Sequence, residues 1–170
     1  MAVTYIKIAS VAVGSGGAAT IEFTSIPGTY TDLLLLSSTR DGTTADNNTE
    51  FKLRFNSSST SWTNRYIQGN GSTVGTGSYA TTYFYTGESD GNTATANTFG
   101  SSSIYIPQYA ASTNKSVISD LVSEENTTVS YATISGGLWS DSSAITSIQI
   151  TCNGTWAQYS TATLYGISKS

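Results

Sequence analysis

Residues 50–56 read Glu-Phe-Lys-Leu-Arg-Phe-Asn, with apolar side chains at 51, 53 and 55 alternating with Lys52 and Arg54. A period of two predicts a β-strand with one buried face and one solvated face. Upstream, the segment 31–39 holds four consecutive leucines at 33–36. A short apolar run of this kind bounded by turn residues is typical of a buried strand, so we expect it at the centre of a sheet.

The rest of the chain has the same character. Runs rich in Val, Ile, Thr and Tyr are separated by clusters of Gly, Asn, Ser and Asp, which is the pattern of strands and turns. No window keeps an apolar repeat of 3.6 residues over three turns, so we expect no long helix. The predicted strands are residues 3–13, 19–26, 31–39, 50–56, 61–68, 79–86, 98–106, 116–122, 127–134, 145–152 and 160–167. Residues 40–49, 71–78 and 87–96 are expected to be loops.

These strands lie close together in sequence and do not alternate with helical segments. The absence of this alternation argues against a parallel sheet, and the prediction is an all-β antiparallel β-sandwich with jelly-roll-like character. The spacing leaves no room for a second domain, so we expect residues 1–170 to form one unit.

Composition removes several classes of function. The chain has 170 residues, a net charge of −4, 11% charged residues, one Cys and no His. Without His, a His-based triad or metal site cannot form, and one Cys cannot form an internal disulfide. The acidic balance disfavours nucleic acid, and no apolar stretch is long enough for a membrane span. No signal peptide is expected, since Lys7 and Ser10 interrupt the first apolar stretch. We expect no enzyme activity, no catalytic residues and no cofactor.

Two polar features allow an alternative interpretation. Asp41, Asp46, Asn47 and Asn48 share one loop, and such oxygen ligands can hold Ca²⁺. Their spacing does not follow the EF-hand pattern, and Asx-rich loops mostly cap their own backbone, so we predict no metal site. Cys152 alternates with Ile148 and Ile150, and we interpret it as a small buried hydrophobe.

The aromatic residues beside the turns are the candidate contact residues. An exposed aromatic ring can stack on a sugar or anchor a protein partner. The alternative is that these rings close the ends of the core and turn their polar atoms outward. The candidates for partner or glycan contact are Trp62, Tyr66, Tyr83, Tyr85, Trp139 and Trp156.

The surface chemistry favours a protein that is permanently in contact with other proteins. There are 28 Ser and 28 Thr among the 170 residues, so outward strand positions can be polar without being charged. Such a surface avoids the cost of desolvating charges at an interface and the entropy cost of ordering long charged side chains. This profile indicates an assembly component.

Several segments resemble the small β-rich virion structural proteins of tailed phages, cyanophages in particular. The matching segments are residues 8–13, 19–40 (ATIEFTSIPGTYTDLLLLSSTR), 52–56 (KLRFN), 65–72 (RYIQGNGS), 96–109 (ANTFGSSSIYIPQY), 115–126 (KSVISDLVSEEN), 134–150 (ISGGLWSDSSAITSIQI) and 160–167 (STATLYGI). The resemblance implies a particle component without an active site, assembled in the cytoplasm of a bacterial host and located in the virion.

Two placements on the particle follow from the resemblance. One is a capsid decoration or cement protein that binds and stabilises neighbouring capsid subunits. The other is a tail-fibre or receptor-binding module that contacts a host glycan. Compactness without coiled-coil heptads or a collagen-like stalk favours decoration, and by analogy we expect a homotrimer. The expected capsid-contact elements are the strand 3–13 and the loops 40–49 and 87–96.

Overall fold

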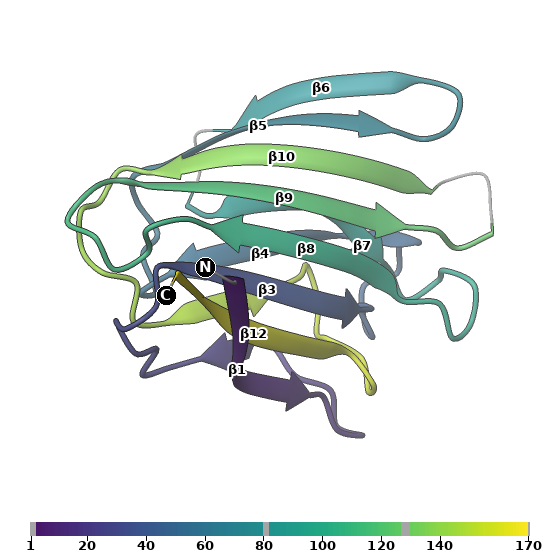
Figure 1. The fold of residues 1–170 in the computed structure, drawn as a ribbon. Helices are drawn as coiled ribbons and strands as arrows, with labels where there is room; N and C mark the ends of the chain where they lie inside the picture. The colour runs from purple at the N-terminus through teal and green to yellow at the C-terminus, as the bar shows by residue number, and fades with distance from the viewer. Residues whose placement is uncertain (1–2, 80–81, 127–129, 170) are drawn as a thin grey trace.

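A computed structural model describes residues 3–79, 82–126 and 130–169. The described residues form twelve β-strands arranged in two antiparallel sheets (Figure 1). The strands are β1 Val3–Ala12, β2 Ile21–Phe23, β3 Asp32–Thr39, β4 Asn48–Phe55, β5 Trp62–Gly69, β6 Val74–Tyr79, β7 Phe84–Asp90, β8 Gly100–Ile106, β9 Lys115–Ser123, β10 Tyr131–Trp139, β11 Ile148–Thr151 and β12 Thr161–Lys169.

The larger sheet has the strand order β1-β12-β3-β8-β9-β10-β5-β6, and the smaller has the order β2-β11-β4-β7. The two sheets pack face to face, so the all-β antiparallel sandwich predicted from the sequence is confirmed. A jelly-roll winding is compatible with this arrangement and stays a prediction. Within the described residues, no helix is long and apolar enough to cross a membrane.

The alternating segment behaves as its pattern predicts. Phe51, Leu53 and Phe55 of β4 are fully buried between the sheets, whereas Lys52 and Arg54 are half-exposed. β3 is an interior strand between β12 and β8, as expected for the leucine run. Leu33 and Leu35 face the core, but Leu36 is exposed on the outer face of the larger sheet.

The predicted loop at residues 71–78 is wrong. Residues 71–78 are not a loop, because Val74–Tyr79 forms strand β6 and pairs with β5 in a hairpin. Gly75 and Gly77 have weak strand propensity, and the backbone pairing with β5 stabilises the strand at these positions.

The next predicted strand is also displaced. Within 79–86, residues 80–81 lie outside the described part of the chain, and β7 begins at Phe84. β7 continues to Asp90, into the predicted loop 87–96. Nearly every side chain of β7 is buried, because β7 lies between β4 and the larger sheet. A strand enclosed on both faces has no alternation to reveal it.

Smaller differences concern strand ends. β4 begins at Asn48, inside the predicted loop 40–49. β2 and β11 are shorter than the segments 19–26 and 145–152. The predicted strand 127–134 begins in residues 127–129, which lie outside the described part, and the observed strand is β10.

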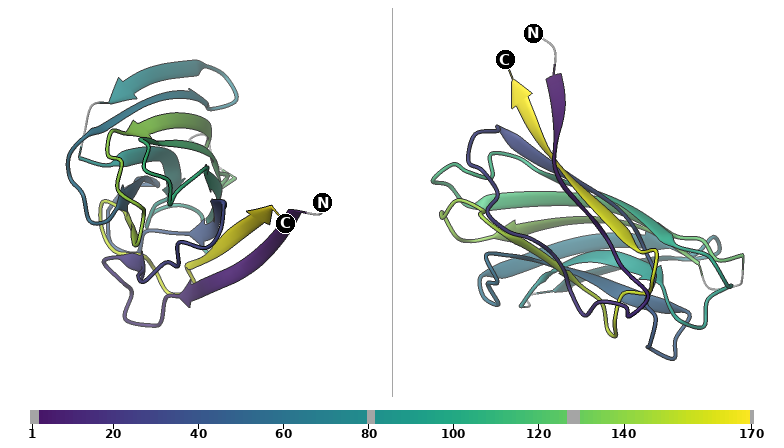
Figure 2. Two further views of the ribbon diagram at one scale, coloured as in Figure 1. Left: turned by 60° about the vertical axis from the view of Figure 1, so that its left-hand side comes forward. Right: turned by 90° about the horizontal axis from the view of Figure 1, so that it is seen from below.

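The strand β1 forms an edge of the larger sheet. It pairs with β12 from Val3↔Lys169 to Ala12↔Thr161. Figure 2 shows the ends of this two-stranded ribbon projecting together away from the rest of the sandwich. Tyr5 and Ile6 are exposed on β1, so an apolar edge strand is available on this side of the molecule.

Candidate functional site

The three tryptophans predicted as contact residues lie in the core. Trp62 and Trp139 stack with ring centroids 5.9 Å apart, and Phe55 contacts both rings. Their indole nitrogens donate hydrogen bonds to Ser58. Trp156 packs on Phe51 at 5.5 Å. All three are buried, so they cannot present a ring to a sugar or a partner, and the core-closing alternative describes them correctly.

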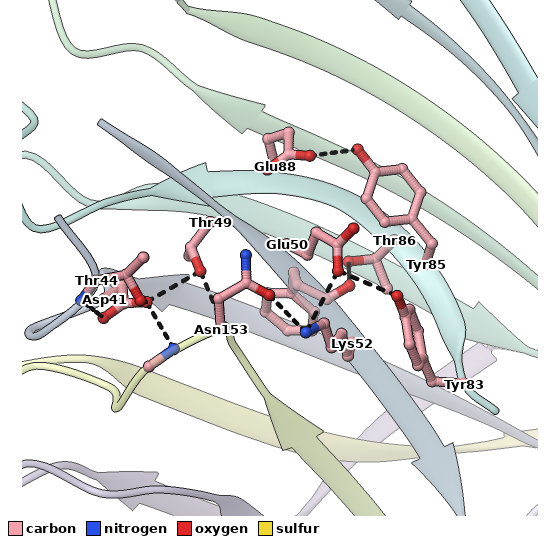
Figure 3. Close-up of polar contacts among 12 residues, drawn as sticks. Asp41, Thr44, Thr49, Glu50, Lys52, Tyr83, Tyr85, Thr86, Glu88 and Asn153 are labelled. Atoms are coloured by element: carbon pink, nitrogen blue, oxygen red, sulfur yellow. Dashed lines mark hydrogen bonds and ion pairs between the residues drawn. The ribbon is translucent and has the colours of Figure 1, made fainter. Parts of the chain in front are cut away.

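Tyr83 lies on the outer side of the smaller sheet, in a cluster of charged side chains. Its hydroxyl donates to Oε2 of Glu50 at 3.1 Å. Lys52 lies over the ring at 5.4 Å and pairs with Glu50 at 3.3 Å, and it donates to Oδ1 of Asn153. Figure 3 shows this continuous row of contacts along β4. The half-buried Tyr83 is therefore part of a polar surface that is already internally paired.

The Asp41 carboxylate holds two loops together. It is fully buried and accepts six hydrogen bonds, from the backbone and hydroxyl groups of Thr43 and Thr44, from the Thr49 hydroxyl and from the Gly154 amide (Figure 3). Burial alone raises the pKa of Asp41, but these donors outweigh it and lower the pKa to about 2. The loop thus caps its own backbone. In the described ranges, no three His, Cys, Asp or Glu side chains gather in a way that could hold a metal ion.

Cys152 lies beside this loop and is buried. Burial, together with the nearby Asp41 carboxylate, raises the pKa of the thiol to about 12. The sulfur is therefore protonated at neutral pH, and a protonated thiol is a poor nucleophile.

The remaining two candidates, Tyr66 and Tyr85, meet in a cleft between the sheets. Their ring centroids are 5.1 Å apart. The Tyr85 hydroxyl donates to Oε1 of Glu88 at 2.9 Å, and Oε1 of Gln68 lies 3.4 Å from it. We call this space the inner cleft. Its volume is about 380 Å³, and its walls are Asn48, Tyr66, Gln68, Asn70, Thr73, Gly75, Thr76, Tyr85, Glu88 and Tyr131.

The cleft exists because β6 extends beyond the smaller sheet and carries glycine at its inward positions. Gly75 and Gly77 lie opposite Gln68 and Tyr66 in the β5–β6 register. A Cβ at position 77 would come within 2.5 Å of the Tyr66 ring, so glycine is needed for that ring to lie against β6. Asn70 closes the hairpin, since its Oδ1 accepts hydrogen bonds from Ser72 and Thr73.

The opposite face of the same strands is apolar and exposed. We call it the outer patch, and it consists of Ile67 on β5, Val74 on β6, Ile118 and Val122 on β9, and Ile134 on β10. Ile134 and Ile67 are direct cross-strand partners. The small residues Gly69 and Ala132 leave a shallow depression of about 340 Å³ among them. Asp120 lies within the patch, between Ile118 and Val122 on β9 and directly opposite Ile134, and brings one negative charge to it.

Sequence reasoning named Tyr66 and Tyr85 of the inner cleft as contact candidates, but it did not identify the rest of the cleft or the outer patch. On β5 the polar residues Asn64 and Gln68 point inward and the apolar Ile67 points outward, which inverts the usual alternation. The cleft residues come from five strands and one turn that share no motif. Only their strand pairing places them together. Comparisons with protein-family models, with curated protein sequences and with solved structures gave no match for this chain.

Proposed function

We propose that the protein is a non-enzymatic structural component of a tailed-phage particle. In this role it acts as a capsid decoration or cement protein that holds neighbouring protein subunits together. The proposal is supported by the low charge of the chain and by the resemblance of its strand-and-turn segments to small virion proteins. It locates the protein in the virion, after assembly in the bacterial cytoplasm, with capsid proteins and its own copies as partners.

The observation that carries the proposal is the outer patch. Five branched aliphatic side chains gather on the solvent face of one sheet, with Val74 exposed by 70% and Ile134 by 56%. Contiguous exposed apolar residues mark protein interaction sites, and contacts between identical subunits are the more apolar class. We assign the outer patch to contacts between copies of this chain, in a homotrimer.

The β1 edge supplies a second contact of a different kind. Its outer backbone groups have no strand beside them in the described sheet, and Tyr5 and Ile6 are exposed along it. An exposed edge strand pairs readily with a strand of another chain. We assign the β1 edge to attachment to a capsid subunit.

Cosedimentation with particles assembled without this protein tests the proposal. The full chain should sediment with such particles at a saturable stoichiometry, and a variant lacking residues 1–9 should show at least a tenfold loss of affinity. Thr24→Lys, at an exposed position after β2, is the matched control and should bind as the full chain does. Failure of the full chain to sediment with the particles would contradict the proposal.

A tail-fibre or receptor-binding module is the competing placement. The polar inner cleft favours it, since a tail module would contact a host glycan. Imaging of particles with and without the protein separates the two placements, because extra density would lie on the capsid for a decoration protein and on the tail for a receptor-binding module.

A further inference from the structure

The inner cleft has the shape of a binding site that the assembly role does not use. It lies on the core-side face of β5 and β6, whereas the outer patch covers the other face of the same strands. Its volume of about 380 Å³ falls within the range of about 300–1,000 Å³ typical of small-molecule sites.

The hydrogen-bonding groups of the cleft are only partly used by the protein. Tyr85 has one hydroxyl proton, and the shorter contact directs that proton to Glu88. Among the residues that the structure describes, the side chains of Asn48 and Tyr131 and the Nε2 of Gln68 make no hydrogen bond. The cleft therefore offers donors and acceptors from three strands to a ligand.

The charges of the cleft select the class of ligand. Of the described residues that form its walls, Glu88 is the one acidic residue, and none is Lys or Arg. Burial raises the pKa of Glu88, a hydrogen bond from Tyr85 opposes that shift, and the nearby Glu50 carboxylate adds to it. A phosphate, a sulfate or an acidic sugar would find no cation here and would meet a carboxyl group. A purely apolar ligand would leave the amide and hydroxyl groups without partners.

A neutral sugar satisfies both conditions. Its hydroxyl groups can donate to the Glu88 carboxyl oxygens and to the amide oxygens, and they can accept from amide nitrogens and tyrosine hydroxyls. Its ring presents C–H groups that pack on an aromatic face, and the half-buried Tyr66 contributes its ring to the cleft, whereas Tyr85 is buried behind it. We propose that the inner cleft binds a neutral oligosaccharide.

Gly75 provides a sharp test. Among the described residues other than its chain neighbours, the nearest heavy atom to a Cβ at this position is the Gln68 carbonyl oxygen at 3.9 Å. Gly75→Val therefore has room for its Cβ and extends a side chain into the cleft. The matched control is Ser78→Val, which adds the same side chain on the same strand, opposite Arg65 and outside the cleft. Gln68→Ala removes one hydrogen-bonding group and leaves the strand in place.

Two measurements cover dissolved and surface-attached sugars. Cellotriose, maltotriose and chitotriose are titrated into ¹⁵N-labelled protein and followed by NMR, and a printed array of neutral glycans is probed with the same protein. We expect saturable shifts in β5, β6 and β7 with at least one neutral sugar. Gly75→Val should weaken that binding at least tenfold and Gln68→Ala about tenfold, and Ser78→Val should leave it unchanged.

Three results would overturn the assignment. They are no saturable binding to any neutral sugar in either measurement, binding confined to acidic glycans such as sialyllactose, and equal binding by wild type and Gly75→Val. None of these results depends on particle attachment through β1, so the sugar site and the decoration role are tested independently of each other.

Discussion

Single side chains explain both the rigidity of one loop and the failure of one sequence-based prediction. Asp41 satisfies donors from three segments of the chain and is fully buried. Its Asx character, visible in the sequence, correctly predicted a capping role. Trp62 shows the limit of such reasoning, since its position beside a turn left both exposure and burial in the core open. Its partners Phe55 and Trp139 become neighbours only through the packing of the two sheets.

Asp41 should make the free energy of unfolding depend on pH. Its pKa falls from 3.8 to about 2 on folding, so the carboxylate stabilises the fold fully above pH 4, and that contribution is lost as the pH falls towards 2. The shift corresponds to about 2 kcal/mol. Asp41→Asn should lower the free energy of unfolding at pH 7 by at least that amount and flatten the slope between pH 4 and 2.

Chemical denaturation at several pH values measures this effect. The control is Asp46→Asn, an exposed position in the same loop, which should change stability by less than about 0.5 kcal/mol. Equal pH slopes for wild type and Asp41→Asn would show that the buried carboxylate does not carry the effect.

At the scale of elements, the strands with a regular pattern were predictable and those without one were not. β4 and β9 alternate strictly between buried and exposed residues, and the sequence located both within two residues. The segment of β6 was predicted as a loop, because β6 has glycine at its inward positions. The strand β7 was predicted several residues too early, because it is enclosed on both faces and shows no alternation. The inner cleft lies between these two strands, so the site was hidden where the sequence pattern is weakest.

The loop between β7 and β8 is organised by one cation. The Arg40 guanidinium donates to the carbonyl oxygens of Asn92, Ala94, Thr95 and Thr98, at 2.7–3.1 Å. A planar fork with several donors can serve all of these acceptors at once, whereas a lysine ammonium cannot.

Arg40→Lys should therefore loosen this loop while leaving the sheets intact. We expect faster hydrogen exchange and faster proteolysis within residues 92–98, together with a loss of roughly 2 kcal/mol in the free energy of unfolding. Arg65→Lys is the control, because Arg65 is exposed and, within the described part of the chain, its side chain donates to the adjacent Asn64 carbonyl alone. An unchanged exchange rate in Arg40→Lys would contradict the role assigned to the guanidinium.

At the scale of the whole molecule, the class of fold followed from composition and alternation, but the useful surfaces did not. Knowing that a chain forms a sandwich does not tell which face of each strand is inward. Ile67 and Gln68 are neighbours in sequence, yet they belong to opposite surfaces, the outer patch and the inner cleft.

The outer patch should determine the state of association. We expect the wild type to have a mass in solution near three times 17.8 kDa by light scattering. Ile67→Lys places a charge in the patch beside Ile134, with one strand between it and Asp120, and should give a monomer with unchanged circular dichroism. Thr24→Lys adds the same charge elsewhere and should keep the trimer. A wild type that is monomeric at micromolar concentration would contradict the assignment of the patch to self-association.

The order of strands in the larger sheet has a consequence for biosynthesis. The strand β12 sits between β1 and β3, so β1 has no strand to pair with until residues 161–169 have been synthesised. Contacts between such distant parts of a chain form slowly. The nascent polypeptide therefore carries β1 as an unpaired apolar segment until β12 has been made, and aggregation through this segment competes with folding during that time.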